Sequence, residues 1–471
     1  MTTFTFSSRV PHPVEDVFAW HARPGALTRL TPAWTGSVVE ESSPPLQDGT
    51  RSRLRVAVPG SYGLASVPWT AEHHGFVPGR EFRDRMVKGP LASWEHHHRF
   101  DDDGHGGTVV TDTVEYAALP GSRAFGDRLM SPALGRQFEA RARRLAADLE
   151  LHSRYPGRPL TVAVTGASGT IGVQLAALLS TGGHTVLRFV RREARTPLEI
   201  SWDPAAGELD PAALRGVDVV VNLAGRSIGG RLTDAAKEQI HDSRVLGTRL
   251  LVRAFVALGD EAPAALVNGS AIGYYGADTH GESVTEKSPP GDDFLAEVCT
   301  AWERAAQEAE AIGTRVVTVR TGVVQSPAGG ALKAQLPLFL AGLGGRLGSG
   351  DQWLSWISLD DTVGLFAHAV LSPGLHGPVN AVAPMPVTGR DYARTLGKVL
   401  GRPALLPTPG FGPKLVLGSE GAELMALADQ RVSADRAIDR GYRFRHPDLG
   451  GRGRVRGGRR PGTAPRRGGS S

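Results

Sequence analysis

The distribution of apolar and polar residues over 1–150 predicts a segment that mixes strands and helices. Residues 4–8 alternate between the two kinds, as a half-buried strand does. Pro13 then opens a short helix over 14–20, because proline suits the first turn of a helix. A long helix is expected after Pro132, with its apolar residues on one face. Further strands are predicted over 50–58, 69–76, 93–100 and 108–116.

A different pattern begins near residue 160. Residues 152–159 contain two prolines and a glycine, which is typical of a linker between domains. Strands and helices then alternate, so we expect an α/β fold with a doubly wound parallel sheet. The predicted strands are 160–165, 185–190, 217–222, 265–270, 315–321 and 378–383, and the predicted helices are 171–180, 233–258 and 294–311.

A glycine-rich turn joins the first of these strands to the first helix. Gly166 suits a tight turn, Gly169 lets the backbone approach a pyrophosphate, and Gly172 lets helix and strand pack closely. The helix start adds free N–H groups and a positive dipole end. A purely structural turn is the alternative, but the strand–turn–helix context favours dinucleotide binding. The expected cofactor-binding residues of this turn are Gly166, Ser168, Gly169, Thr170, Ile171 and Gly172.

The end of the second strand indicates which dinucleotide is bound. An NAD site usually has an acidic residue there for the ribose 2′-hydroxyl. This chain has Arg191 and Arg192 instead, and guanidinium groups suit a 2′-phosphate by charge and by geometry. We therefore expect NADP(H) in preference to NAD(H). The alternative is that both arginines are simply solvated loop charges.

Several motifs resemble one protein family. The glycine turn, residues 222–225 and residues 270–276 are similar to those of extended short-chain dehydrogenases/reductases, and in particular of the epimerase-like oxidoreductases. The resemblance extends over 160–449 and implies a Rossmann fold with cofactor contacts from Leu223, Ala224 and Gly225. Further matching segments are 200–203, 243–245, 286–297, 320–324 and 356–361, with 430–432 and 441–448 resembling the small extra domain that ends these proteins.

The first segment resembles the helix-grip fold of the START/polyketide-cyclase-like superfamily. That resemblance implies a curved sheet wrapped round a helix, with a cavity that binds an apolar ligand. The expected organisation is thus a helix-grip domain over 1–151, a linker over 152–159 and an NAD(P)-binding Rossmann domain over 160–400. A small family-specific domain over 401–449 and a disordered Arg/Gly-rich tail over 450–471 follow.

The resemblance also exposes a departure from the usual chemistry. Members of the superfamily transfer hydride with a Ser, a Tyr and a Lys four residues after the Tyr. Ser270 occupies the serine position, but the other two positions fall on Phe294 and Val298, which cannot move a proton. Tyr275 is then the preferred acid/base, with Tyr274, Lys287 and Glu286 as further candidates; the two tyrosines could equally form a turn and a pocket wall.

The charge and composition of the chain indicate which classes of partner we expect it to bind. The net charge is +5, but seven arginines and no acidic residue lie in 450–471, so subtracting them leaves −2 for the rest. We therefore expect no nucleic-acid surface apart from nonspecific binding by the tail. No apolar run is long enough to span a membrane, and the N-terminus does not resemble a signal peptide. The single cysteine, Cys299, fits a reducing cytoplasm.

His96 and His98 share one face of a predicted strand. A zinc site would need further ligands, and His73 and His74 are the neighbours that the sequence offers. We expect these residues to line the cavity, with no metal bound.

Together these features predict a cytoplasmic NADP(H)-dependent oxidoreductase or epimerase for a small hydroxyl- or carbonyl-bearing compound. The competing hypothesis is a non-catalytic sensor or scaffold that responds to NADP(H), because the domain lacks the usual tyrosine and lysine.

Overall fold

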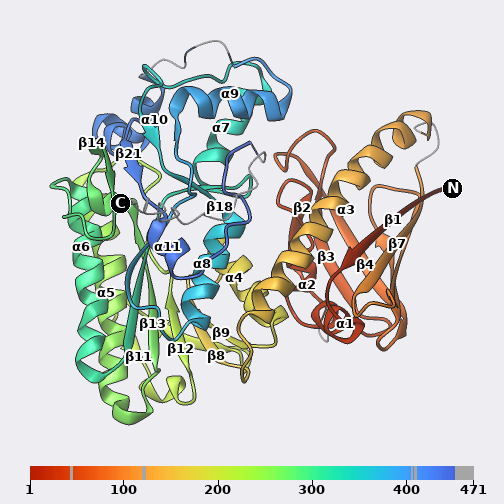
Figure 1. The fold of residues 1–471 in the computed structure, drawn as a ribbon, viewed down its shortest axis with the longest axis horizontal. Coiled ribbons are helices and arrows are strands. Elements are labelled where there is room, and N and C mark those ends of the chain that lie inside the picture. Colours follow the sequence, from red (N-terminus) through yellow and green to blue (C-terminus); the bar gives the residue numbers. More distant parts are fainter. Residues whose placement is uncertain (43–45, 119–122, 405–406, 408–410, 451–471) are drawn as a thin grey trace, which may run out of the picture.

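The N-terminal module is an antiparallel sheet packed against helices. The computed structural model describes residues 1–42, 46–118, 123–404, 407 and 411–450. Seven strands form the sheet in the order β1-β7-β6-β5-β4-β3-β2, at the right of Figure 1. The strands are β1 (Thr2–Val10), β2 (Gly36–Glu40), β3 (Arg51–Ala57), β4 (Ser66–Val77), β5 (Glu81–Lys88), β6 (Ser93–Asp102) and β7 (Thr108–Ala117); the helices are α1 (Val14–Ala22), α2 (Ala26–Arg29) and α3 (Arg123–Ser153).

The sequence-based prediction for this module was wrong for the start of one helix and missed two strands, β2 and β5. The closing helix α3 does not start after Pro132 but contains it, because a proline removes only one helical hydrogen bond and apolar residues such as Phe138 still pack on the sheet. Strand β5 was not predicted. Its inward positions include Asp84, and a polar residue at an inward position interrupts the expected apolar alternation.

The predicted doubly wound sheet is confirmed. Eight strands run in the order β11-β10-β9-β8-β12-β13-β15-β19, and every pair except β10–β11 is parallel. The order reverses between β8 and β12, where such folds open a crevice for ligands. The strands are β8 (Thr161–Thr165), β9 (Thr185–Val190), β10 (Glu199–Asp203), β11 (Glu208–Leu209), β12 (Val219–Asn222), β13 (Ala265–Ala271), β15 (Arg315–Thr321) and β19 (Gly377–Ala381).

Helices cover both faces of this sheet, as Figure 1 shows. Helices α4 (Thr170–Thr181) and α8 (Leu359–Leu371) share one core with the strands, and α5 (Asp234–Leu258) and α6 (Phe294–Gln307) cover the other face. Smaller elements gather beyond the carboxyl ends of the strands: β14 (Asp278–Val284), α7 (Gly330–Leu340), α9 (Gly389–Leu400), α10 (Phe411–Gly421) and β21 (Asp429–Val432). The short helix α11 (Asp435–Asp439) instead packs beside the start of β19. Within the described residues, no helix is long and apolar enough to cross a membrane.

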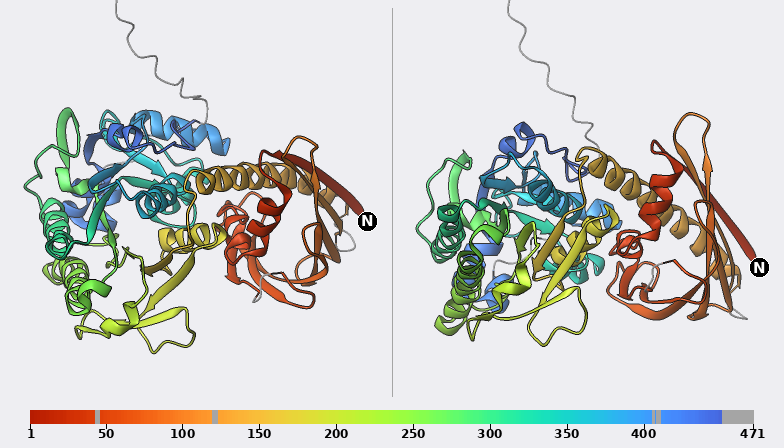
Figure 2. Two further views of the ribbon diagram at one scale, coloured as in Figure 1. Left: turned by 60° about the horizontal axis from the view of Figure 1, so that its bottom comes forward. Right: turned by 90° about the horizontal axis from the view of Figure 1, so that it is seen from below.

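The last turns of α3 connect the two domains. This helix reaches from the N-terminal sheet to the Rossmann domain (Figure 2). Leu151 belongs to the same core cluster as β8 and α4, and Tyr155 packs against that cluster. Arg158 also binds Asp218, which precedes β12. The segment 152–159 therefore contacts the Rossmann domain through Tyr155 and Arg158.

Buried charges strengthen this connection. Asp148 on α3 has no exposed side-chain surface, and its carboxylate accepts from Arg29 Nε at 2.7 Å and from Arg445 Nη1 at 2.6 Å. Arg29, itself fully buried, also donates to Gln174 of α4. The two arginines hold the pKa of Asp148 below its usual range although burial alone would raise it. One carboxylate therefore holds together the N-terminal module, α3 and the end of the chain.

Replacing Asp148 with Asn should strongly destabilise the protein. Two buried arginines would lose their charged partner, and breaking a buried pair typically costs about 3–5 kcal/mol. Urea unfolding at neutral pH measures the loss. The control on the same helix is Glu139→Gln, because Glu139 and Arg143 form an exposed pair and the change should leave the unfolding midpoint unaltered. Equal midpoints for the two variants would mean that the buried carboxylate contributes no more to stability than an exposed one.

Candidate functional site

The glycine turn lies where two backbone segments meet. Gly166 has φ +64°, and a Cβ there would stand 2.8 Å from the carbonyl oxygen of Leu223. A Cβ on Gly172 would collide with the carbonyl oxygen of Gly166. Glycine is therefore required at both positions, as expected from the sequence.

The start of α4 is open to a ligand. The first hydrogen bond of the helix runs from Val173 N to Gly169 O at 3.0 Å, so the preceding amides of the first turn have no partner inside the helix. Ser168, Gly169 and Thr170 are exposed. Such an end attracts anions through its N–H groups and dipole. The predicted residues Ile171 and Gly172 complete this first turn.

A buried hydrogen-bond network holds the turn beside β12. The Thr165 hydroxyl donates to Asn222 Oδ1 at 2.7 Å and accepts from the backbone N–H of Leu223 and Ala224 at 2.9 and 3.0 Å. The Asn222 amide donates in turn to Thr248 and Asn268. The structure therefore brings the predicted segment Leu223–Ala224–Gly225 against the glycine turn.

The two predicted arginines differ in their surroundings. Both follow β9 directly and both are exposed. Arg192 donates to the two carboxylate oxygens of Glu199 at 2.9 and 2.6 Å, and this ion pair lowers the pKa of Glu199 to about 2. That side chain is occupied by an intramolecular partner, so Arg191 is the better placed of the two for an external anion.

Ser270 and Tyr275 belong to a second buried network beyond β13. The Ser270 hydroxyl donates to Glu303 Oε1 at 2.7 Å, and Glu303 binds Arg320 through both carboxylate oxygens at 2.8 Å. The Tyr275 hydroxyl accepts from Arg320 at 3.0 Å and donates to Asn380 Oδ1 at 2.7 Å. The structure thus joins the two predicted catalytic residues through an ion pair on neighbouring elements.

Sequence reasoning did not identify Glu303 or Asn380 as members of this network. Arg320 stood within one of the family-like segments, but nothing in that segment indicated its partners. Burial raises the pKa of Tyr275 to about 12, and so its hydroxyl is held as a neutral group. Tyr274 is half-buried, and its ring faces the Arg320 guanidinium. Phe294 begins α6 and Val298 is buried on it, so neither position supplies an acid or a base.

The N-terminal module contains two adjoining hollows, of about 480 and 300 Å³ counted with the open solvent in them. Their walls mix apolar residues such as Leu30 with the charged and polar groups of Arg141, Asp84 and His98. His96 and His98 lie on the inner face, each beside two carboxylates that the sequence pattern did not indicate. The other two histidines that the sequence offered, His73 and His74, have different surroundings. His73 lines a hollow, whereas His74 forms an ion pair with Glu95.

Comparison with protein families matches most of the chain in three parts. Residues 1–150 match the family described as polyketide cyclase / dehydrase and lipid transport. Residues 162–380 match the NAD dependent epimerase/dehydratase family, and residues 408–451 match a domain of unknown function, DUF1731.

Curated relatives match the second and third parts. An epimerase family protein of Mycobacterium bovis is 43% identical over 291 residues, which are 61% of this chain and 95% of that protein. The human epimerase family protein SDR39U1 is 37% identical over 62% of this chain and 97% of its own length.

Two solved structures extend the likeness. A nucleoside-diphosphate sugar epimerase of Corynebacterium glutamicum superposes with a TM-score of 0.77 at 36% identity, covering 95% of this chain and 88% of that one. Human SDR39U1, solved with NADPH, superposes with a TM-score of 0.57 at 35% identity, covering 62% of this chain and 97% of that one. The Corynebacterium protein therefore shares nearly the whole chain, N-terminal module included.

Thr165→Val should loosen the glycine turn. Valine keeps the shape of threonine but leaves Asn222 Oδ1 and two backbone N–H groups without their partner, at a cost of about 1–3 kcal/mol. The free energy of unfolding measures the loss. Thr165→Ser retains the hydroxyl and should preserve most of the stability. If the two variants were equally unstable, the threonine would act through its methyl group instead.

Proposed function

This chain belongs to the epimerase family, and we propose that its Rossmann domain binds NADP(H) in order to reduce, oxidise or epimerise a small hydroxyl- or carbonyl-bearing compound. The observation that carries the proposal is the glycine turn at the β8–β12 switch point, where a side chain on Gly166 or Gly172 would strike the backbone. Backbone packed this closely holds the open start of α4 at the switch point, which is where a diphosphate binds in such folds.

The residues of the glycine turn fit the diphosphate of the cofactor. The backbone amides at the start of α4, which have no partner inside the helix, would face the diphosphate, and Leu223–Ala224–Gly225, held there by Thr165, would form the opposite wall. When bound, a nicotinamide cofactor supplies hydride exchange with carbon–oxygen bonds. The chain's own contribution is to hold the cofactor and to orient the substrate beside it.

The position of Arg191 supports the binding of NADP(H) in preference to NAD(H). It stands at the end of β9, where the adenosine ribose lies in such folds, and its neighbour Arg192 is engaged by Glu199. The NADPH complex of the human relative supports the same choice.

We expect Arg191→Ala to weaken NADPH binding about 10–100-fold, the size of a lost charge-assisted hydrogen bond, and to change NADH binding little. Calorimetry with both nucleotides measures the difference. Arg192→Ala is the matched control, and because its guanidinium is paired with Glu199 it should affect NADPH less. An equal loss of NADPH and NADH affinity in Arg191→Ala would remove the assignment of a 2′-phosphate site.

A second function is supported by the buried network of Ser270 and Tyr275. Both hydroxyls are hydrogen-bonded inside the protein, and the usual tyrosine and lysine positions hold Phe294 and Val298. A domain of this kind could bind NADP(H) without turnover and act as a cofactor-responsive binding protein. The N-terminal module would then carry the ligand that the cofactor state controls, and its family description, which includes lipid transport, supports an apolar molecule there.

Turnover separates the two functions. The full-length protein is incubated with NADPH and a panel of small carbonyl compounds, including nucleoside-diphosphate sugars, and the absorbance of the reduced nicotinamide is followed. We expect oxidation with at least one class, since the cofactor turn is complete. Tight binding of NADPH without oxidation across the panel would instead favour the binding protein.

Tyr275→Phe tests the candidate acid/base in the same assay. If Tyr275 supplies the proton, kcat should fall at least 100-fold with little change in NADPH affinity, in line with the usual contribution of acid/base catalysis of about 10²–10⁴-fold. Tyr274→Phe tests the next candidate in the same way. An unaltered kcat in Tyr275→Phe would leave the hydroxyl a structural partner of Arg320 and Asn380.

A further inference from the structure

Four polar side chains form a compact group on the inner face of the N-terminal sheet. In the strand register, Asp84 of β5 stands opposite His96 of β6, and His98 of β6 stands opposite Asp112 of β7. Residues two apart on a strand point the same way, so both histidines face inward between the two carboxylates. Only 4% of the His96 side chain and 6% of the His98 side chain are exposed.

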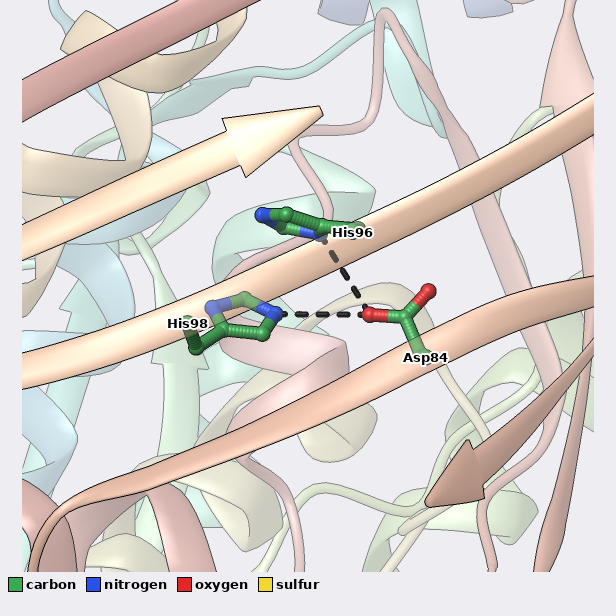
Figure 3. A group of neighbouring side chains, drawn as sticks. All are labelled: Asp84, His96 and His98. Carbon is green, nitrogen blue, oxygen red and sulfur yellow. Dashed lines mark hydrogen bonds and ion pairs between the residues drawn. The ribbon is translucent and has the colours of Figure 1, made fainter. Parts of the chain in front are cut away.

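The four distances in this group fall into two pairs. Asp112 Oδ1 lies 3.0 Å from His96 Nε2 and 2.8 Å from His98 Nδ1, which are ordinary hydrogen-bond lengths. Asp84 Oδ2 lies 3.3 Å from His96 Nδ1 and 3.3 Å from His98 Nε2 (Figure 3). Charged N–H···O pairs are usually about 2.7–2.9 Å long. The contacts to Asp84 are therefore long for hydrogen bonds.

One arrangement of the ring protons accounts for this asymmetry. A neutral imidazole has one N–H and one lone pair. If Asp112 accepts the N–H of both rings, the remaining nitrogens, His96 Nδ1 and His98 Nε2, direct their lone pairs at Asp84. Lone pairs and a carboxylate oxygen repel one another unless a proton or a metal ion lies between them. Ligands about 2.0–2.1 Å from a tetrahedral zinc ion are about 3.3–3.4 Å apart, which matches both contacts.

We infer that Asp84 Oδ2, His96 Nδ1 and His98 Nε2 form a binding site for a divalent transition metal of the zinc class. The ligand atoms lie within 4.8 Å of one another. Asp112 has the place of the outer carboxylate that orients metal-binding histidines through their second N–H. Three protein ligands leave a fourth position for water or another ligand, which is the composition of catalytic zinc sites. The inference is independent of the function proposed for the Rossmann domain.

The surroundings indicate which ligand the fourth position would take. Asp84 and His98 line the larger of the two hollows, so the metal would be reached from it. Arg141 of α3 lines the same hollow and interacts electrostatically with both carboxylates. The carboxylates balance the charge of the metal, and the guanidinium adds one positive charge. The hollow therefore suits an anionic oxygen ligand, such as a carboxylate or an enolate. Apolar wall residues, among them Leu30, Leu46 and Phe82, would contact the rest of that ligand.

Metal titration of the full-length protein tests the site. Protein freed of metal with a chelator is titrated with Co²⁺, which reports tetrahedral ligation through its visible absorption, and then with Zn²⁺ in competition. We expect one ion per chain, tetrahedral Co²⁺ bands that Zn²⁺ removes, and a higher unfolding temperature with Zn²⁺ because binding favours the folded state.

Variants then locate the ion. Asp112→Asn should weaken Zn²⁺ binding about 10–100-fold as an outer partner, and Asp84→Asn, His96→Gln and His98→Gln should each weaken it further. The control is His97→Gln, on the same strand but the opposite face, which should leave Zn²⁺ affinity unchanged. Full Zn²⁺ affinity in His98→Gln would place the ion elsewhere and overturn the inference.

A measurement on the unaltered chain guards against variants that fail to fold. With ¹⁵N-labelled histidines, Zn²⁺ should shift His96 Nδ1 and His98 Nε2 to the values of metal-bound nitrogens, while His96 Nε2 and His98 Nδ1 stay protonated. If stoichiometric Zn²⁺ left both rings doubly protonated, the cluster would be a metal-free set of ion pairs and the inference would be wrong. Absence of stoichiometric binding in the titration would have the same consequence.

Discussion

The nucleotide site depends on the hydroxyl of one threonine. Thr165 ends β8, and its side chain ties that strand to Asn222 and to the two residues after β12. Because the hydroxyl donates one hydrogen bond and accepts two, it has no remaining capacity in a fully buried position. The glycine turn follows directly, and the Gly166 backbone rests on the carbonyl of Leu223. The helix start is thereby held at the switch point of the sheet, where a diphosphate would bind.

Buried ion pairs likewise hold separate structural elements together, in this case over larger parts of the molecule. The Glu303–Arg320 pair connects α6 with β15 and holds the hydroxyls of Ser270 and Tyr275. Asp148 between Arg29 and Arg445 connects the N-terminal module with the end of the described chain. Such pairs add little net stability, but they fix the orientation of the groups that they join. The side chains of Ser270 and Tyr275 therefore have little freedom to move.

The molecule presents two separate candidate sites on one connected frame. The glycine turn and the histidine cluster lie in different domains, and α3 contributes to both: Arg141 lines the hollow beside the histidines, and Leu151 packs in the core beneath β8 and α4. A ligand that displaced α3 in the N-terminal module would act on a helix whose last turns belong to the Rossmann core. The Corynebacterium protein, which covers 95% of this chain, shares this arrangement of domains.

The local sequence was sufficient to predict those elements whose pattern is carried by neighbouring residues. The turn from Gly166 to Gly172 could be identified because the spacing of its glycines between a strand and a helix is a local pattern, although the close contact of Gly166 with Leu223 is not. The alternating strands and helices of the second domain indicated the sheet. Pro132 misled the prediction of α3 because the local cost of a proline was outweighed by packing against a distant sheet. Only the tertiary structure could bring Asp84 and Asp112 to the two histidines, because the register of three consecutive strands sets those contacts. Glu303 and Asn380 meet Ser270 and Tyr275 through packing between residues far apart in the chain. The sequence by itself thus determined the glycine turn. The tertiary structure decided which polar groups meet, because buried charged groups pair with the groups that lie beside them in space.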